Sequence, residues 1–354
     1  MAWWNWPDNI IFEAVPCLLS NNIKGLHRFY SKIARDKPIH NDLENTPCIL
    51  GCSLNDETIL VGQDLLHNFL GAFTVVKCCS CGLMRTNPRP TPDSIGFYYP
   101  DDYGPYIGTQ IRQKAATPSK SGIKKLLKLF KHIFKFNTSH LPPLKPGRLL
   151  EIGCASGSFL HQMANQGWQV QGIEFSEKAA RAAAQQGYSV YTGSLESAPP
   201  PNESFDLIVG WMVLEHLHDP IGSLKKLREW ANQDAWLVFS VPNAGSLEFS
   251  LFKNKWYALQ LPTHLYHFTP ATIEKVLSAG GWKIEKIFHQ RNLNNLIAST
   301  GYVLRDKGYS KLAQKFIDFP TQSGYWNYAL YPLAWLFSIF GQTGRMTVWA
   351  RITK

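Results

Sequence analysis

Four cysteines are spaced in a way that suggests metal chemistry. Cys78 and Cys81 lie in "CCSCG" with two residues between them and a glycine directly behind, and Cys48 and Cys52 precede them in the chain. Two such pairs of thiolates are the usual ligands of a structural zinc ion, which leaves no coordination position open for a substrate. The spacing of the first pair is one residue longer than usual. We expect a zinc-ribbon-like domain, with reduced and metal-free thiols as the alternative.

A second candidate site lies in "LLEIGCASGSF", where an acid sits in an apolar run and small residues follow. Gly153 and Gly157 lack a Cβ, so the backbone amides beside them can approach a ligand closely. The dinucleotide fingerprint G-x-G-x-x-G is absent, because only the first of its three glycines is present. With Glu151 just ahead of the loop, the motif favours a ligand that has a cationic amino group and no pyrophosphate. An ordinary tight turn is the alternative for the loop alone.

Glu174 strengthens the ligand interpretation. It ends the next apolar run, and a carboxylate at that position can accept both hydroxyls of a ribose. Phe175, directly after it, can cover one face of an adenine ring. The pattern therefore predicts a ligand with a ribose and an adenine at the carboxyl ends of two neighbouring strands.

A regular alternation of strands and helices surrounds these residues. The alternation is typical of a parallel sheet that is covered by helices on both faces. The predicted strands are 148–152, 169–174, 188–191, 205–211, 235–241, 282–288 and 345–352. The predicted helices are 157–166, 176–186, 220–232 and one that begins at Thr269 with Pro270 at its first position. Residues 289–344 are too long for a hairpin and are predicted to form a helical insert.

Taken together, Glu151–Gly157, Glu174 and "FDLIVGWMVLEHLHDP" (205–220) resemble the class I S-adenosylmethionine-dependent methyltransferases, in the broad group that acts on small molecules and sugars. The resemblance covers about residues 145–290 and the final strand. It implies an α/β fold with a doubly wound, seven-stranded Rossmann-like sheet whose last strand is antiparallel. It also implies S-adenosylmethionine as the cofactor.

The resemblance assigns cofactor contacts to particular residues. Glu151 and the loop amides would hold the methionine part, Glu174 would take the ribose hydroxyls, and Phe175 would border the adenine. Ser194 stands where the family often has Asp, and Ala155 replaces the middle glycine of the loop. The implied cofactor-binding residues are Glu151, Gly153, Cys154, Ala155, Gly157, Glu174, Phe175, Ser194, Leu195 and Trp211.

Histidines after the fourth and fifth predicted strands are the candidates for acid–base chemistry. Methyl transfer is an in-line displacement, so the enzyme has to position the nucleophile and, where necessary, remove its proton. His264 is the preferred general base, since histidine titrates near neutral pH. His267 could do the same or support the helix that begins at Thr269. His216 could instead border the cofactor, and Glu215 could bond an acceptor hydroxyl or the backbone.

The net charge of +10 comes from one segment. Residues 103–150 contain ten Lys or Arg and no Asp or Glu, so the rest of the chain is balanced, which argues against a nucleic-acid partner. Within that segment, 122–136 predicts a basic amphipathic helix, suited to a membrane surface or to covering the cofactor pocket. The predicted organisation is a segment of unassigned role at 1–40, a zinc-ribbon-like domain at 41–105, the basic helix and linker at 106–144, and a methyltransferase domain at 145–354 with the insert 289–344.

We expect a cytoplasmic protein, because the first residues lack the features of an export signal. The acceptor would be a small molecule, a sugar or a lipid-linked glycan. Peripheral contact with the inner face of a membrane would use 122–136 and the uncharged stretch 321–344, for which covering the active site is the alternative. Two other functions stay open: an NAD(P)-dependent sugar-modifying oxidoreductase, and a non-catalytic protein that binds a membrane or nucleic acid.

Overall fold

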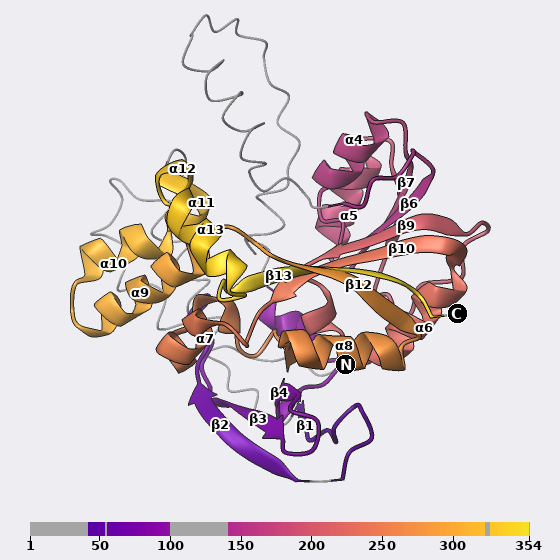
Figure 1. The fold of residues 1–354 in the computed structure, drawn as a ribbon. Helices are drawn as coiled ribbons and strands as arrows, with labels where there is room; N and C mark the ends of the chain where they lie inside the picture. Colours follow the sequence, from indigo (N-terminus) through magenta and orange to yellow (C-terminus); the bar gives the residue numbers. More distant parts are fainter. Residues whose placement is uncertain (1–41, 54, 100–140, 323–325, 354) are drawn as a thin grey trace, which may run out of the picture. The chain divides into compact units, whose positions relative to one another are not determined.

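The computed structural model of the chain describes residues 42–53, 55–99, 141–322 and 326–353 (Figure 1). The N-terminal segment 1–40 and the predicted basic helix at 122–136 lie outside these residues. The described residues form a large mixed sheet with helices on both sides, a smaller antiparallel sheet, and a group of helices between the last two strands of the large sheet.

The large sheet has seven strands in the order β12-β13-β10-β9-β6-β7-β8. They are β6 (Arg148–Ile152), β7 (Gln169–Glu174), β8 (Ser189–Thr192), β9 (Phe205–Trp211), β10 (Ala231–Pro242), β12 (Trp282–His289) and β13 (Arg345–Ile352). β13 is antiparallel to both of its neighbours, and the other paired strands run parallel. The predicted doubly wound, seven-stranded sheet with an antiparallel last strand is confirmed.

Helices cover the two faces of this sheet. They are α4 (Ser158–Ala164), α5 (Glu177–Ala184), α6 (Pro220–Glu229) and α8 (Pro270–Ala279). α4 and α5 lie on one side of the sheet, and α6 and α8 on the other (Figure 1). The structure corrects one boundary: α6 ends at Glu229 and Ala231 already begins β10, so the helix predicted over 220–232 is too long.

Successive side chains of the central strands enter two separate hydrophobic layers, as expected for strands buried on both faces. Leu149 of β6 and Leu207 of β9 pack with Leu160 of α4. Their sequence neighbours Leu150 and Ile208 belong to the other layer, which contains the buried side chains of α6 and α8. This alternation explains why near-continuous apolar runs form these strands.

The smaller sheet has the order β11-β4-β3-β2, and all of its pairings are antiparallel. Its strands are β2 (Asp56–Gly62), β3 (Phe73–Cys78), β4 (Met84–Thr86) and β11 (Tyr266–His267). A further pair, β1 (Leu43–Glu44) with β5 (Arg89–Pro90), and the short helix η1 (Ile95–Tyr98) complete this region. β11 comes from the loop that precedes α8, so a segment that follows the central strands of the large sheet completes the N-terminal sheet.

The helical insert is confirmed. Between β12 and β13 lie α9 (Asn294–Asp306), α10 (Ser310–Ile317), α11 (Phe319–Gln322), α12 (Trp326–Ala329) and α13 (Tyr331–Ile339). The short helices α7 (Leu247–Phe252), η2 (Leu214–His216), η3 (Lys253–Lys255) and η4 (Tyr257–Leu259) lie in the loops after β9 and β10. Within the described ranges, no helix combines the length and apolar character needed to cross a membrane.

Thr86 of β4 joins the smaller sheet to the loop before β11 through buried hydrogen bonds. Its amide donates to the carbonyl of Leu265 over 2.9 Å, and its hydroxyl donates to the carbonyl of His264 over 2.7 Å. The Nε2 of His267 lies 3.2 Å from the same hydroxyl oxygen. Because that hydroxyl already donates its hydrogen, His267 must donate from Nε2, which leaves Nδ1 unprotonated. Burial in this dry junction lowers the pKa of His267 to about 3.

We predict that replacing His267 by Gln makes the protein less sensitive to acid. The folded pKa lies below the ordinary value of about 6.5, so between these two values the unfolded chain binds the extra proton and stability falls as pH decreases. In the wild type, the imidazole makes the free energy of unfolding fall by up to about 1.4 kcal/mol for each pH unit of acidification. His267→Gln lacks this contribution, so its stability should fall less steeply than that of the wild type. Chemical denaturation at several pH values between 4.5 and 7.5 measures this slope.

Thr86→Val is the matched control, because it removes the hydrogen-bond partner but keeps the titrating ring. It should lower stability at every pH and retain the wild-type slope. An unchanged slope in His267→Gln would contradict a buried neutral imidazole at this position.

Candidate functional site

A cavity of about 600 Å³ opens at the carboxyl ends of the parallel strands, the edge where ligands bind in sheets of this kind. Its walls come from the loops after β6, β7, β8 and β9, from the segment before β11, from the first residue of β13, and from the N-terminal region. Among the lining residues are Pro92, Ile95, Tyr99, Gly153, Ala155, Glu174, Phe175, Ser194, Leu195, Trp211, His216, Gln260, His264 and Arg345.

The cavity includes nine of the residues predicted from the sequence and leaves out four. The nine are Gly153, Ala155, Glu174, Phe175, Ser194, Leu195, Trp211, His216 and His264. Glu151, Cys154, Gly157 and His267 do not line it. His267 instead faces Thr86 within the smaller sheet, where β11 lies beside β4.

The loop after β6 has a left-handed backbone at several positions. Gly153 has a φ of 69°, and a Cβ there would lie 2.7 Å from a methyl group of Val213. Gly157 also has a positive φ, but a Cβ there would meet Ala183 of α5 at 3.0 Å. A side chain at Gly157 would therefore collide with α5 at the start of α4. A side chain at Gly153 would collide with Val213 beside the cavity.

Two further predicted residues, Glu151 in β6 and Cys154 in the loop, are buried and do not line the cavity. The thiol of Cys154 packs against β7, since a Cβ at Gly172 would lie 2.5 Å from its Sγ. Glu151 is buried, and burial together with the nearby Glu174 carboxylate raises its pKa well above the usual range. Its Oε2 has no hydrogen-bond partner in the described part of the chain.

Glu174 lines the cavity and accepts hydrogen bonds from two backbone amides. Its Oε2 accepts the amide of Ala155 at 2.8 Å, and its Oε1 accepts the amide of Ser176 at 2.7 Å. Burial raises the pKa of Glu174, and these amides oppose the rise. Each carboxylate oxygen has a second lone pair, so both can still accept a hydroxyl. Phe175 beside it is half exposed, with the ring of Tyr99 centred 6.3 Å away.

Two histidines and a carboxylate meet at the other end of the cavity. Ligand atoms of Glu215, His216 and His264 all lie within 4.8 Å of one another, a distance that would also admit a metal ion. The Nδ1 of His216 lies 2.8 Å from the carbonyl of Thr263, and that of His264 lies 2.9 Å from the carbonyl of Ala258. A carbonyl only accepts, so the ring of His264 carries its hydrogen on Nδ1 and has its lone pair at Nε2. The Nδ1 of His216 also lies 2.8 Å from the hydroxyl of Tyr99, so this nitrogen contacts both a carbonyl and a hydroxyl.

Burial sets the protonation of this cluster. It lowers the pKa of His216 to about 4 and that of His264 well below its usual value, so both rings are neutral near neutral pH. Burial also raises the pKa of Glu215 to about 8. Both oxygens of this carboxyl group are buried and lack a hydrogen-bond partner among the described residues. The two neutral rings line the cavity, whereas the carboxyl group of Glu215 lies behind them and, with a pKa of about 8, is mostly protonated near neutral pH.

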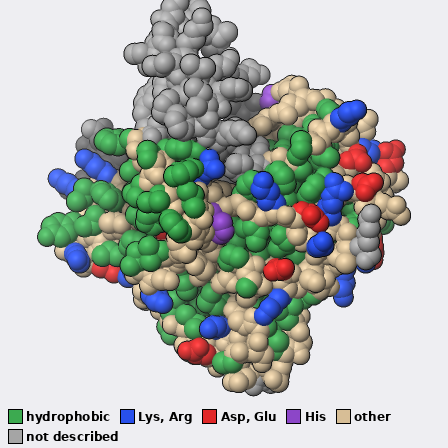
Figure 2. All heavy atoms as spheres, viewed as in Figure 1, with side chains coloured by type: hydrophobic (Ala, Val, Ile, Leu, Met, Phe, Trp, Pro, Cys, Tyr) green, Lys and Arg blue, Asp and Glu red, His purple; other side chains and the backbone are tan. Residues whose placement is uncertain are grey.

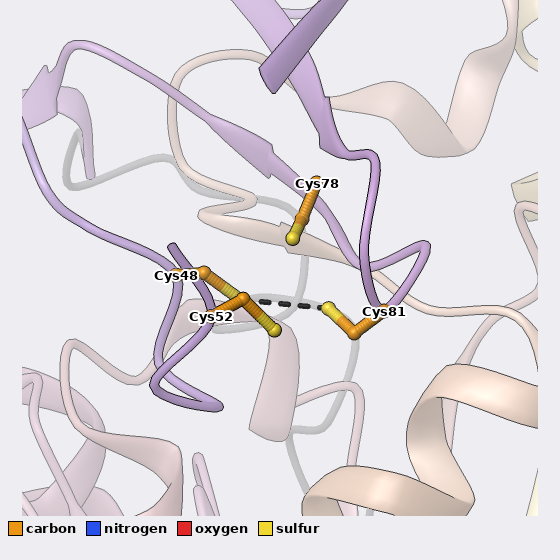
Figure 3. Close-up of side chains that lie close together, drawn as sticks. All are labelled: Cys48, Cys52, Cys78 and Cys81. Carbon is orange, nitrogen blue, oxygen red and sulfur yellow. Dashed lines mark hydrogen bonds between the residues drawn. The ribbon is translucent and has the colours of Figure 1, made fainter. Parts of the chain in front are cut away.

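The four predicted metal-binding cysteines converge at one point (Figure 3). Their sulfur atoms all lie within 4.8 Å of one another, and the sulfurs of Cys48 and Cys81 are 3.5 Å apart. Burial acts to raise the pKa of Cys78, but amide hydrogen bonds from Cys81 and Ser80 outweigh it and lower the pKa to about 7. Amides directed at a sulfur atom are typical of a metal-binding turn, so four thiolates in this arrangement fit a tetrahedral zinc site.

Arg345 and Gln260 line the cavity but were not predicted. A signal for Arg345 was present in the sequence. Because β13 runs antiparallel to its neighbours, its first residue, and not its last, lies at the edge where the parallel strands end. Gln260 has a left-handed backbone in a loop without regular structure, and no sequence pattern indicated its position.

Comparisons with known proteins agree on one family. Residues 123–287 match a family described as "Methyltransferase domain". The chain is 30% identical over 122 residues to a ubiquinone biosynthesis O-methyltransferase of Albidiferax ferrireducens, which covers 32% of this chain and 48% of that protein. It is 28% identical over 159 residues to the protein of the same name from Thiobacillus denitrificans, with 41% and 68% covered.

Among solved structures, an S-adenosylmethionine dependent methyltransferase from Mesorhizobium loti is 18% identical, with a TM-score of 0.39, and the match covers 59% of this chain and 93% of that one. The chain spans between about half and two thirds of the length of the first curated relatives. Residues 123–287 thus match a methyltransferase domain, and the seven-stranded sheet with its antiparallel last strand fits the Rossmann-like fold of class I S-adenosylmethionine-dependent methyltransferases.

Proposed function

We propose that this protein transfers a methyl group from S-adenosylmethionine to a small-molecule acceptor that binds in the 600 Å³ cavity. The observation that carries the proposal is the position of Glu174. Its buried carboxylate, which has lone pairs available, lines the same cavity as the two neutral histidines His216 and His264. When bound, the cofactor supplies a methyl group on a sulfonium, which an acceptor atom displaces in line.

In this proposal the residues at the ends of β6, β7 and β8 hold the cofactor. Gly153 and Ala155 border its methionine part, and Glu174 accepts the ribose hydroxyls. Phe175 covers the adenine ring, with Ser194 and Leu195 at its edge. Glu151, Cys154 and Gly157 support this loop from outside the cavity, and Trp211 forms the wall between cofactor and acceptor.

The histidines would take the proton of the acceptor. His264 presents Nε2 because its Nδ1 donates to a backbone carbonyl, and His216 is held at its Nδ1 by the carbonyl of Thr263 and the hydroxyl of Tyr99. A neutral imidazole in a dry site accepts a proton weakly, since burial disfavours its charged form. The nearby carboxyl group of Glu215, whose pKa is raised to about 8, would stabilise the imidazolium in its ionised form.

The acceptor atom in this proposal is a hydroxyl oxygen. The relatives from A. ferrireducens and T. denitrificans are named O-methyltransferases, which favours oxygen over nitrogen or carbon. The narrower acceptor class is a sugar or a lipid-linked glycan. Pro92, Ile95 and Tyr99 of the N-terminal region form one wall of the cavity, where a second part of such an acceptor would lie.

The four cysteines would bind one structural zinc ion. Cys78 ends β3 and Cys81 lies in the turn to β4, so the metal would clamp the hairpin whose second strand pairs with β11. Four thiolates complete the coordination of zinc, so the ion would take no part in the reaction.

We further propose that the protein works in the cytoplasm and touches the inner face of a membrane through the helical insert. α13 contains no charged residue, and large apolar side chains stay exposed on and after it, with Phe340 at 68%. Figure 2 shows hydrophobic side chains gathered over this insert, with Lys and Arg beside them. Exposed lysines on or next to α10 (Lys307, Lys311 and Lys315) could attract anionic lipid.

Cofactor binding tests the central proposal. Calorimetric titration should show micromolar binding of S-adenosylmethionine and none of NAD. Glu174→Ala should weaken the affinity by about tenfold or more, equivalent to about 1.4 kcal/mol, because the ribose loses its acceptor. Glu177→Ala is the matched control, since that acid is exposed at the start of α5. Binding of NAD alone would favour the oxidoreductase, and binding of neither would contradict the enzyme proposal.

Metal analysis tests the zinc site. Mass spectrometry of the purified protein should find about one zinc per chain. Cys81→Ser should lose the metal and lower the thermal midpoint, because the β3–β4 turn loses its clamp. Cys79→Ser, which changes an exposed neighbour in the same turn, should keep both. A metal-free and equally stable wild-type protein would exclude the site.

Vesicle sedimentation tests the membrane contact. The protein should bind vesicles that contain phosphatidylglycerol more tightly than vesicles of phosphatidylcholine alone. Leu336→Ser with Phe340→Ser should weaken binding by about tenfold, since two apolar side chains no longer enter the interface. Val61→Ser changes an exposed apolar residue of β2 and should have no effect. Equal binding of both variants would rule out the insert as the contact.

A further inference from the structure

Arg345 stands apart from the other polar residues of the cavity. It is the first residue of β13, opposite Pro242 at the end of β10, and it lines the cavity. Among the described lining residues it is the one arginine or lysine. No hydrogen bond or ion pair joins its guanidinium to a residue that the structure describes, and its Nε is buried without a partner. A guanidinium with open donors in a cavity is suited to bind an anion.

Two buried carboxyl groups accompany Arg345 without bonding to it. Glu215 and Glu248 are both fully buried. Burial lowers the pKa of Arg345, and the attraction of these two groups opposes that effect. Space for Glu248 exists because residue 344 is glycine: a Cβ there would lie 2.1 Å from Glu248 Oε2. The guanidinium is thus stabilised by nearby charge while its hydrogen-bond donors stay available.

The sheet order shows which ligand can reach Arg345. β13 lies three strands from β6, which at about 4.8 Å per strand places Arg345 about 14 Å from the glycine loop. Glu174 ends β7, on the opposite side of β6, so the proposed cofactor extends away from Arg345. In contrast, the charge of Arg345 acts on His264, whose pKa it lowers after burial and the other histidines. Arg345 therefore belongs to the acceptor end of the cavity.

We propose that Arg345 binds an oxyanion of the acceptor, so that the enzyme selects acceptors that carry a carboxylate or phosphate group near the methylated oxygen. This inference rests on the proposed function for the identity of the ligand as a methyl acceptor. Anchored at Arg345, such an acceptor would present its hydroxyl to the Nε2 atom of His264, beside His216. The planar guanidinium of Arg345 can donate two parallel hydrogen bonds to the carboxylate or phosphate. This bidentate contact would orient the acceptor as well as bind it.

The test measures anion binding directly and does not require turnover. The probes are 3,4-dihydroxybenzoate, the uncharged catechol, and glucose 6-phosphate, each titrated by calorimetry into the full-length protein with and without S-adenosylhomocysteine. Wild-type protein should bind at least one of the two anionic probes, and 3,4-dihydroxybenzoate about tenfold or more tightly than catechol. Arg345→Met should abolish that preference, and Arg345→Lys should restore part of it, since it keeps the charge but not the fork.

The cofactor serves as the internal control. Affinity for S-adenosylhomocysteine should be the same in wild type and Arg345→Met, with circular dichroism confirming the fold. If Arg345→Met fails to fold, two other proteins replace it: Arg345→Lys, and the double variant that combines Glu248→Gln with Arg345→Met. Their affinities for the anionic probes and for S-adenosylhomocysteine are then compared with those of the wild type. A loss of cofactor affinity in step with anion affinity would overturn the proposal, because Arg345 would then hold the carboxylate of the cofactor. Equal anion binding in all variants would also overturn it.

The two proposals fail in different ways. Anion binding that depends on Arg345 without any binding of S-adenosylmethionine or S-adenosylhomocysteine would remove the methyltransferase function and leave an oxyanion site. Normal cofactor binding without discrimination between 3,4-dihydroxybenzoate and catechol would remove the acceptor inference alone.

Discussion

The antiparallel pairing of Tyr266 and His267 with Arg85 and Met84 is the contact on which the candidate site depends. It joins the cysteine-bearing sheet to the loop that carries His264. Two hydrogen bonds from Thr86 extend the pairing to Leu265 and His264, so four consecutive residues of the loop are attached to the N-terminal region. A loop without regular structure is otherwise mobile, and its histidine would lack a defined direction. The N-terminal region is therefore one wall of the cavity and the support of its imidazoles.

This arrangement gives the cysteine cluster a mechanical connection to the site. Cys78 and Cys81 border the turn that leads into β4, and β4 pairs with β11. In the proposed zinc-bound state, a metal ion would tighten that turn, and binding free energy would stabilise the hairpin that positions the loop. A small N-terminal region with a limited hydrophobic core gains most from such a crosslink.

Buried acids concentrate near the ligand edge of the large sheet. Glu151, Glu215 and Glu248 are all buried, and each has at least one carboxyl oxygen without a partner among the described residues. An unpaired buried charge costs several kcal/mol, so such groups become neutral or lie near a compensating charge. For Glu215 and Glu248 that charge is Arg345. Perturbed acids of this kind are typical of functional sites, where a bound ligand completes the polar contacts.

By itself the sequence determined the large sheet and the edge at which its cavity lies. Apolar runs bounded by helical stretches define strands locally, and Glu174 lies at the end of its strand whatever the distant parts of the chain do. The cysteine pairs were equally readable, because each pair is local. The tertiary structure decided which histidine serves the cavity: His264 faces it and His267, three residues on, faces Thr86. It also decided the place of Arg345, which depends on strand order and direction. These are long-range pairings, and the local spacing of residues contains no information about a partner that lies far away in the chain.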